Sequence, residues 1–283
     1  MIKISVASIK NIASTPACCL VDPMAAHINQ THLPIVAIDN IHTLKENGSL
    51  PDQMGAALYQ PLLGGIKAKH CLLIHMGHHT QLSEYDFSKW LKRLVAHLKG
   101  KQIKHLAINV ASVQLADQPQ DNAVAWMLRE LLQSQVRVDS LKSKPSTRPV
   151  WEAITLFCKD GMQSKIEQAA IQAHAVQEGM VLTQHLANLP SNYCTPTILA
   201  EQAKALSKTH AAFSCKVLDE SAMKKLGMHA FLSVSAGSSE PAKMVVLHYC
   251  PKSCKGKPPV VLIGKGITFD SGGISLKPSA RMD

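Results

Sequence analysis

The chain has 283 residues, enough for two domains, or for one domain and a substantial part of another. Aromatic residues make up only 4% of the chain, so we expect its core to be mainly aliphatic. No long uninterrupted apolar stretch is present, which argues against a membrane span. In the first residues apolar and polar side chains alternate, as in a strand. These residues lack the basic head and apolar block of a signal peptide. We therefore expect a cytoplasmic location and no membrane partner.

The formal net charge of +10 raises nucleic acid as a partner. The lysines are nevertheless spread along the chain, apart from clusters at residues 142–144 and 252–257. Both clusters lie in proline-containing stretches without interleaved aromatic residues. Solvated loops are the favoured interpretation of both.

The eight cysteines are scattered and form no CxxC pair, which is more typical of reduced core residues than of disulfides. Cys250, Cys254 and His248 could hold a structural zinc, but the spacing is loose and no fourth ligand is apparent. The histidine-rich stretch 75–79 is interpreted as loop residues rather than as a metal site.

The first half of the chain alternates between two kinds of segment. Short buried strands are predicted at residues 3–7, 34–38, 71–75 and 106–110. Apolar spacing predicts a helix over 87–98, with Ser83 and Asp86 capping its start and Gly100 ending it. A second helix is predicted over 121–134. Strands alternating with helices favour an α/β layer structure with a mainly parallel sheet.

A polar stretch at 141–148 breaks this pattern, and one more strand follows at 150–157. Residues 162–187 then show helical spacing without proline, which predicts one long helix. Such a helix after a complete α/β unit suggests a connector. We therefore expect an amino-terminal α/β domain (1–161), a connecting helix (162–189) and an incomplete second domain (190–283).

The second part begins a new α/β pattern. A helix is predicted over 196–206, with Thr195 as its N-cap and Pro196 at its first position. A second helix begins at residues 221–226. Strands are predicted at 213–218, 244–248 and 260–263.

The last predicted strand leads into a glycine-rich loop that carries Lys265, Asp270 and Lys277. A carboxylate such as Asp270 is a hard oxygen ligand that Mn²⁺, Mg²⁺ and Zn²⁺ accept. Lys265 could ligate a metal only as a free amine, which requires a lowered pKa. Lys277 could stay protonated and polarise a carbonyl group. From spacing alone, a simple turn with solvated lysines remains the alternative.

Three segments carry a family resemblance. The sequence GKGITFDSGGISLKP at 264–278 resembles the signature of the leucyl aminopeptidase family, the cytosol aminopeptidases of peptidase family M17. Upstream, LANLPSN at 186–192 and LGMHAFLSVSAGS at 226–238 resemble two further blocks of the family, in the right order. The resemblance covers residues 180–283. The first 160 residues match only in architecture.

The resemblance implies a fold and a chemistry. The fold is an amino-terminal α/β (macro-like) domain, a connecting long helix and the first part of an α/β aminopeptidase catalytic domain. The chemistry is that of a hydrolase, a metalloaminopeptidase that releases amino-terminal residues from peptides with two divalent metal ions, Mn²⁺ or Zn²⁺. By resemblance, Lys265 ligates one metal, Asp270 bridges both, and Lys277 is the catalytic lysine that supports the oxyanion.

The resemblance also implies that the remaining metal ligands lie outside this chain, and Asp283 is not one of them. We therefore expect the amino-terminal part of a longer aminopeptidase, truncated within the catalytic domain and inactive by itself. The full-length protein would act on peptide substrates as a homo-hexamer. The alternative is a non-catalytic nucleic-acid-binding or assembly protein that carries a degenerate peptidase remnant.

Overall fold

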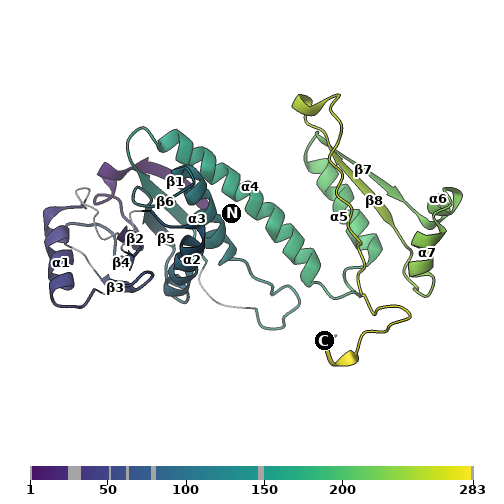
Figure 1. Ribbon diagram of the computed structural model, residues 1–283, viewed down its shortest axis with the longest axis horizontal. Coiled ribbons are helices and arrows are strands. Elements are labelled where there is room, and N and C mark those ends of the chain that lie inside the picture. The colour runs from purple at the N-terminus through teal and green to yellow at the C-terminus, as the bar shows by residue number, and fades with distance from the viewer. Residues whose placement is uncertain are drawn as a thin grey trace. The chain divides into compact units, whose positions relative to one another are not determined.

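The computed structural model describes residues 2–24, 33–50, 52–61, 64–77, 81–145 and 150–281. The chain forms two compact units, Met1–Leu182 and Thr183–Asp283. The division falls inside a single long helix, α4 (Gln163–Asn188), drawn in Figure 1. Its length agrees with the helix predicted over residues 162–187.

The first unit is built on a six-stranded sheet with the order β1-β6-β5-β2-β4-β3. Only the pairing of β3 with β4 is antiparallel, and the other neighbours are parallel. This confirms the predicted α/β class and the mainly parallel sheet. The strands are β1 (Lys3–Ser8), β2 (Cys19–Met24), β3 (Ala57–Pro61), β4 (His70–His75), β5 (His105–Asn109) and β6 (Ala153–Cys158).

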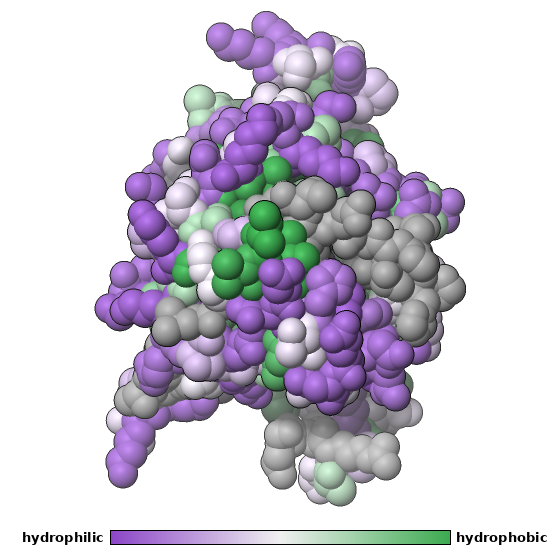
Figure 2. Space-filling view, turned by 90° about the vertical axis from the view of Figure 1, so that its left-hand side faces the viewer, coloured by the Kyte–Doolittle hydropathy of each residue, from purple (hydrophilic) through white to green (hydrophobic). Residues whose placement is uncertain are grey.

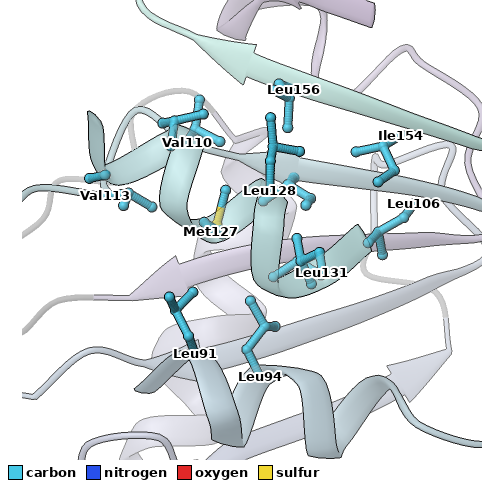
Figure 3. Close-up of a cluster of buried hydrophobic side chains, with 14 of the residues drawn as sticks. Leu91, Leu94, Leu106, Val110, Val113, Met127, Leu128, Leu131, Ile154 and Leu156 are labelled. Carbon is cyan, nitrogen blue, oxygen red and sulfur yellow. The ribbon is translucent and has the colours of Figure 1, made fainter. Parts of the chain in front are cut away.

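Helices cover both faces of this sheet, because parallel strands must be buried on either side. Alternate strand residues divide between two apolar clusters: Leu72 belongs to one and Leu73 to the other. The larger cluster is formed with α2 (Glu84–Leu98), α3 (Gln120–Gln133) and the first half of α4. Figure 3 shows side chains of α2 and α3 facing those of β5 and β6. The smaller cluster is formed with α1 (Ile35–Glu46). The short helix η1 (Ile9–Asn11) lies between β1 and β2 in the chain.

Local signals explain where the helix α2 begins. The Ser83 hydroxyl accepts a hydrogen bond from the Asp86 backbone N–H at 3.1 Å and donates one to its carboxylate at 2.8 Å. This capping satisfies one of the free N–H groups at the start of the helix. Gly100 adopts a φ of +80° just beyond the helix, as predicted from its position.

The strand predicted at residues 34–38 is wrong. These residues open α1, with extended Pro34 at the cap position and Ala37 and Ile41 turned into the core. The strand between β5 and β4 in the sheet is instead β2. The sequence did not predict β2, because Asp22 and Pro23 interrupt its apolar run. Pro23 is tolerated because pairing with β5 ends at Val21. The edge strand β3 was also missed.

The face that carries α1 includes a small apolar surface. Ile35 and Val36, at the start of the helix, are 76% and 58% exposed. Figure 2 shows this side of the molecule, where a few hydrophobic residues lie among hydrophilic ones. In this view the hydrophobic residues gather in one small patch that has hydrophilic residues around it.

The second unit confirms most of its predicted elements. After α4 come α5 (Pro196–Thr209), β7 (Phe213–Leu218), α6 (Glu220–Lys225), α7 (His229–Ser235), β8 (Met244–Tyr249) and the short helices η2 (Lys252–Cys254) and η3 (Ser279–Arg281). Thr195 caps α5 through its side chain, and Pro196 occupies the first helical position, as expected. Strands β7 and β8 pair in antiparallel fashion, and α5 packs against both.

The buried strand predicted at residues 260–263 is also wrong. These four residues have no regular secondary structure, and their exposed fractions are 91%, 70%, 93% and 94%. A strand needs a neighbour to satisfy its backbone groups. Within the described residues, the only pairing of the second unit's strands is that of β7 with β8.

The second unit buries little of its apolar surface. Among its described residues only Cys194, Ala200, Met223 and Ala242 are buried. The two strands β7 and β8 and the helices α5, α6 and α7 give too small a core for a firmly packed domain. None of the helices in the described part of the chain is long and apolar enough to cross a membrane.

We expect Leu128→Ala to destabilise the first unit by about 2–5 kcal/mol, because it deletes a fully buried side chain between α3 and the sheet. Leu141→Ala is the matched control, since Leu141 is 50% exposed, and should change the free energy of unfolding by less than about 0.5 kcal/mol. Urea unfolding followed by far-UV circular dichroism measures both. Equal effects of the two substitutions would contradict the burial of Leu128 between α3 and the sheet.

We also expect the two units to differ in amide hydrogen exchange. Amides of β4 and β5 should exchange slowest, because both strands are central and buried. Amides of β8 should exchange much faster, because most of its side chains are exposed. Exchange read by mass spectrometry after peptic digestion tests this, and similar protection of β5 and β8 would contradict it.

Candidate metal and catalytic site

The three predicted site residues meet around one carboxylate. The Nζ atom of Lys277 lies 3.0 Å from Oδ2 of Asp270, and Nζ of Lys265 lies 3.8 Å from the same oxygen. All three side chains are exposed in part, at 66% for Lys265, 39% for Asp270 and 50% for Lys277. The structure therefore brings together the two amines and the acid that the sequence singled out.

A tight loop returns Lys277 to Asp270. The Gly272 N–H donates to Oδ1 of Asp270 at 3.1 Å, and the Lys277 N–H donates to the Ser271 carbonyl oxygen at 3.0 Å. Gly272 and Leu276 form an isolated antiparallel bridge between the two arms of the loop. The residues converge through this turn, and not through the buried strand that was expected before it.

Gly272 makes the turn possible. Its φ of +92° is one that side chains rarely allow, and a Cβ there would lie 2.3 Å from the Ser275 carbonyl oxygen. Gly273 is different, because a Cβ at that position would meet no described heavy atom within 4 Å outside its chain neighbours. Only the first of the two glycines is required by the loop itself.

The surroundings of Asp270 stabilise its charged form. The hydrogen bond from Lys277 lowers the pKa of this carboxyl below its usual value, and the Gly272 N–H and the charge of Lys265 act in the same direction. The carboxylate is therefore ionised across the neutral range. It offers oxygen atoms of the kind that divalent cations bind.

The donor set fits part of a metal site. Asp270 and Lys265 supply a carboxylate and an amine on the same side of the loop. Zinc and manganese sites take at least four ligands. In the described ranges, no group of three His, Cys, Asp or Glu side chains is placed to hold a metal ion. These residues could hold one side of a cation, and further donors would have to complete the shell.

Where the structure describes them, the weaker metal candidates do not form such a group either. Cys250 and Cys254 are both exposed free thiols. His75 is buried, and its Nδ1 atom accepts a hydrogen bond from the Gly77 N–H at 2.9 Å, which is a structural role at the end of β4. His78 and His79, which complete the histidine-rich stretch, lie outside the described residues.

We expect Gly272→Ala to open the turn and weaken the contact between Lys277 and Asp270. The pKa of the Asp270 carboxyl should then rise toward the ordinary aspartate value, because its cationic and N–H donors move away. Gly273→Ala is the matched control and should leave the pKa low. Carbon-13 NMR of the Asp270 carboxyl during acid titration measures it. An unchanged pKa in Gly272→Ala would show that the turn does not position these groups.

Comparison with known proteins places these residues in a family. Residues 181–283 match a sequence model of the cytosol aminopeptidase family, catalytic domain. The chain is 39% identical over 238 residues to a probable cytosol aminopeptidase of Azotobacter vinelandii, covering 84% of this chain and 48% of the relative. It is 36% identical over 244 residues to the cytosol aminopeptidase of Pseudomonas aeruginosa, covering 86% and 49%.

A solved structure shares the fold. It is described as the bottromycin maturation enzyme BotP in complex with Mn, and it matches with a TM-score of 0.69 at 22% identity. The match covers 94% of this chain and 51% of that one. This chain thus spans about half the length of the curated relatives it matches. It belongs to the cytosol aminopeptidase family, and its residues from 181 onward match that family's catalytic domain.

Proposed function

We propose that this chain is the amino-terminal part of a leucyl aminopeptidase that releases amino-terminal residues from peptides with two divalent metal ions. The observation that carries the proposal is the convergence of Lys265 and Lys277 on Asp270 within a segment of the family's catalytic domain. The BotP structure, a complex with Mn, supports a divalent metal of this class. Either Mn²⁺ or Zn²⁺ would suit the donors.

Each of the three residues has a separate role in this proposal. Lys265, as a free amine, and Asp270, as a carboxylate, would hold metal. Two bound divalent cations would polarise the scissile carbonyl and activate a water molecule. Lys277 would keep its proton and donate a hydrogen bond to the carbonyl oxygen as negative charge develops there. The open space at Gly273 would let a peptide backbone come close to the loop.

The proposal extends to the whole protein. It includes a cytoplasmic location and a full-length enzyme that is a homo-hexamer. It also includes the domain limits 1–161, 162–189 and 190–283. The inactivity of the present chain belongs to it as well, because two metal ligands cannot hold a dinuclear site. The exposed apolar residues of the second unit support a further part of the proposal, namely that additional structure covers them.

We expect the 283-residue chain alone to show no turnover of leucine anilide with added Mn²⁺. We also expect it to bind Mn²⁺ weakly, and Asp270→Asn to reduce that affinity by at least about tenfold, since the substitution removes a charged ligand. Electron paramagnetic resonance of free Mn²⁺ measures the binding. Asp117→Asn is the control for the loss of one negative charge at an exposed position.

The two readouts test different parts of the proposal. Brisk turnover by the chain alone would refute its inactivity. Equal Mn²⁺ binding by Asp270→Asn and by the unmodified chain would refute the ligand role of Asp270. Circular dichroism of each variant confirms that a loss of binding does not reflect unfolding.

A further inference from the structure

A hollow of about 340 Å³ lies on the first unit between α3 and α4, next to the first turn of α2. We name it the α3–α4 pocket. Its walls include Glu84 of α2, Leu115, Trp126 and Arg129 of α3, and Val176 of α4. Its volume is at the lower end of the range for small-molecule sites. The pocket lies wholly within Met1–Leu182 and contains none of the residues around Asp270.

One wall of the pocket is held in place by backbone and side-chain hydrogen bonds. Leu82 and Leu115 form a parallel bridge, in which the Leu82 N–H donates to the Gln114 carbonyl oxygen at 3.2 Å. The Gln118 amide donates to the Glu84 carboxylate at 3.3 Å, and the Asn122 amide donates to Gln118 at 2.9 Å. This wall exists before any ligand arrives, which reduces the entropic cost of binding.

The opposite side is fixed by helix packing. Ala173 of α4 is buried in the larger apolar cluster, and one turn further on the amide of Gln177 donates to the Gln133 side chain of α3 at 3.1 Å. The half-buried Trp126 packs edge-on against Phe87, with ring centroids 5.5 Å apart. The indole is therefore held firmly and presents an apolar surface to the pocket.

The pocket contains two opposite charges that do not pair with each other. In the part of the chain that the structure describes, the Arg129 guanidinium makes no hydrogen bond or ion pair, and Glu84 makes no ion pair. Glu84 lies in the first turn of α2, where a negative charge is stabilised by the helix dipole. A free guanidinium beside a rigid apolar wall is ready to bind a carboxylate.

We propose that the α3–α4 pocket binds a free α-amino acid with an apolar side chain. Arg129 binds the carboxylate of the ligand, and Glu84 binds its ammonium group. Trp126, Leu115 and Val176 contact the side chain. Glu84 disfavours a purely anionic ligand such as a phosphate, and Arg129 disfavours a purely cationic one. Only a ligand with both charges satisfies both residues. This inference does not rest on the proposed function.

The test is isothermal titration calorimetry of the 283-residue chain with L-phenylalanine and L-leucine in the presence of a metal chelator. Because the pocket is small and its rim is exposed, we expect dissociation constants on the order of 1 mM. N-acetyl-L-phenylalanine lacks the ammonium charge, and L-phenylalaninamide lacks the carboxylate. Each should bind at least about tenfold more weakly, because one charged contact is lost.

Two conservative variants test the residues themselves. Arg129→Gln and Glu84→Gln should each weaken L-phenylalanine binding by at least about tenfold. Glu130→Gln is the matched control, because Glu130 is the neighbour of Arg129 on α3 and does not line the pocket. It should bind as the unmodified chain does. Circular dichroism and the thermal midpoint establish that the variants are folded.

Several results would overturn the proposal. One is the absence of saturable L-phenylalanine binding up to about 20 mM, which is well above the expected dissociation constant. Another is unchanged binding in both Arg129→Gln and Glu84→Gln. Asp270→Asn separates this pocket from the metal site and should retain binding. Loss of amino-acid binding in Asp270→Asn, or binding only with added Mn²⁺, would assign the ligand to the metal site instead.

Discussion

Burial of both faces of a parallel sheet is the constraint on which the first unit depends. Each central strand sends alternate side chains to two apolar clusters, so each face must be covered by helices. This requirement fixes α2, α3 and α4 on one face and α1 on the other. The α3–α4 pocket lies on the face that α3 and α4 cover, and Trp126 and Ala173 are among its lining residues. The proposed ligand site thus lies in the layer that covers this face of the sheet.

In the described residues of the second unit, the faces of the small sheet are not both buried. Its two strands have α5 packed against them, and most side chains of β8 remain exposed. Val260 to Ile263 carry the apolar, β-branched composition of a strand, yet they lie open to solvent. Composition specifies a strand only when a neighbour can accept its backbone hydrogen bonds.

These differences explain which predictions from sequence succeeded. Ser83, Thr195 and Gly100 act on residues close to them in sequence, so the caps at the start of α2 and α5 and the end of α2 could be predicted. The segment at Pro34 failed because a short apolar run fits either a strand or a helix, and packing against the sheet decided for α1. Strand β2 was missed because the tolerance of Pro23 depends on where pairing with β5 stops, which is a long-range property.

The candidate site followed from likeness to a family, while its geometry could not be predicted. Spacing alone did not show that Lys277, seven positions beyond Asp270, would approach it more closely than Lys265 does. That closeness depends on the left-handed conformation of Gly272 and on the bridge from Gly272 to Leu276. Under the proposed function this arrangement has a consequence. A cation bound at Oδ2 of Asp270 would lie close to the ammonium group of Lys277, and the two positive charges would repel each other. This repulsion would favour a position of the Lys277 ammonium group away from Asp270, where it could reach a substrate carbonyl.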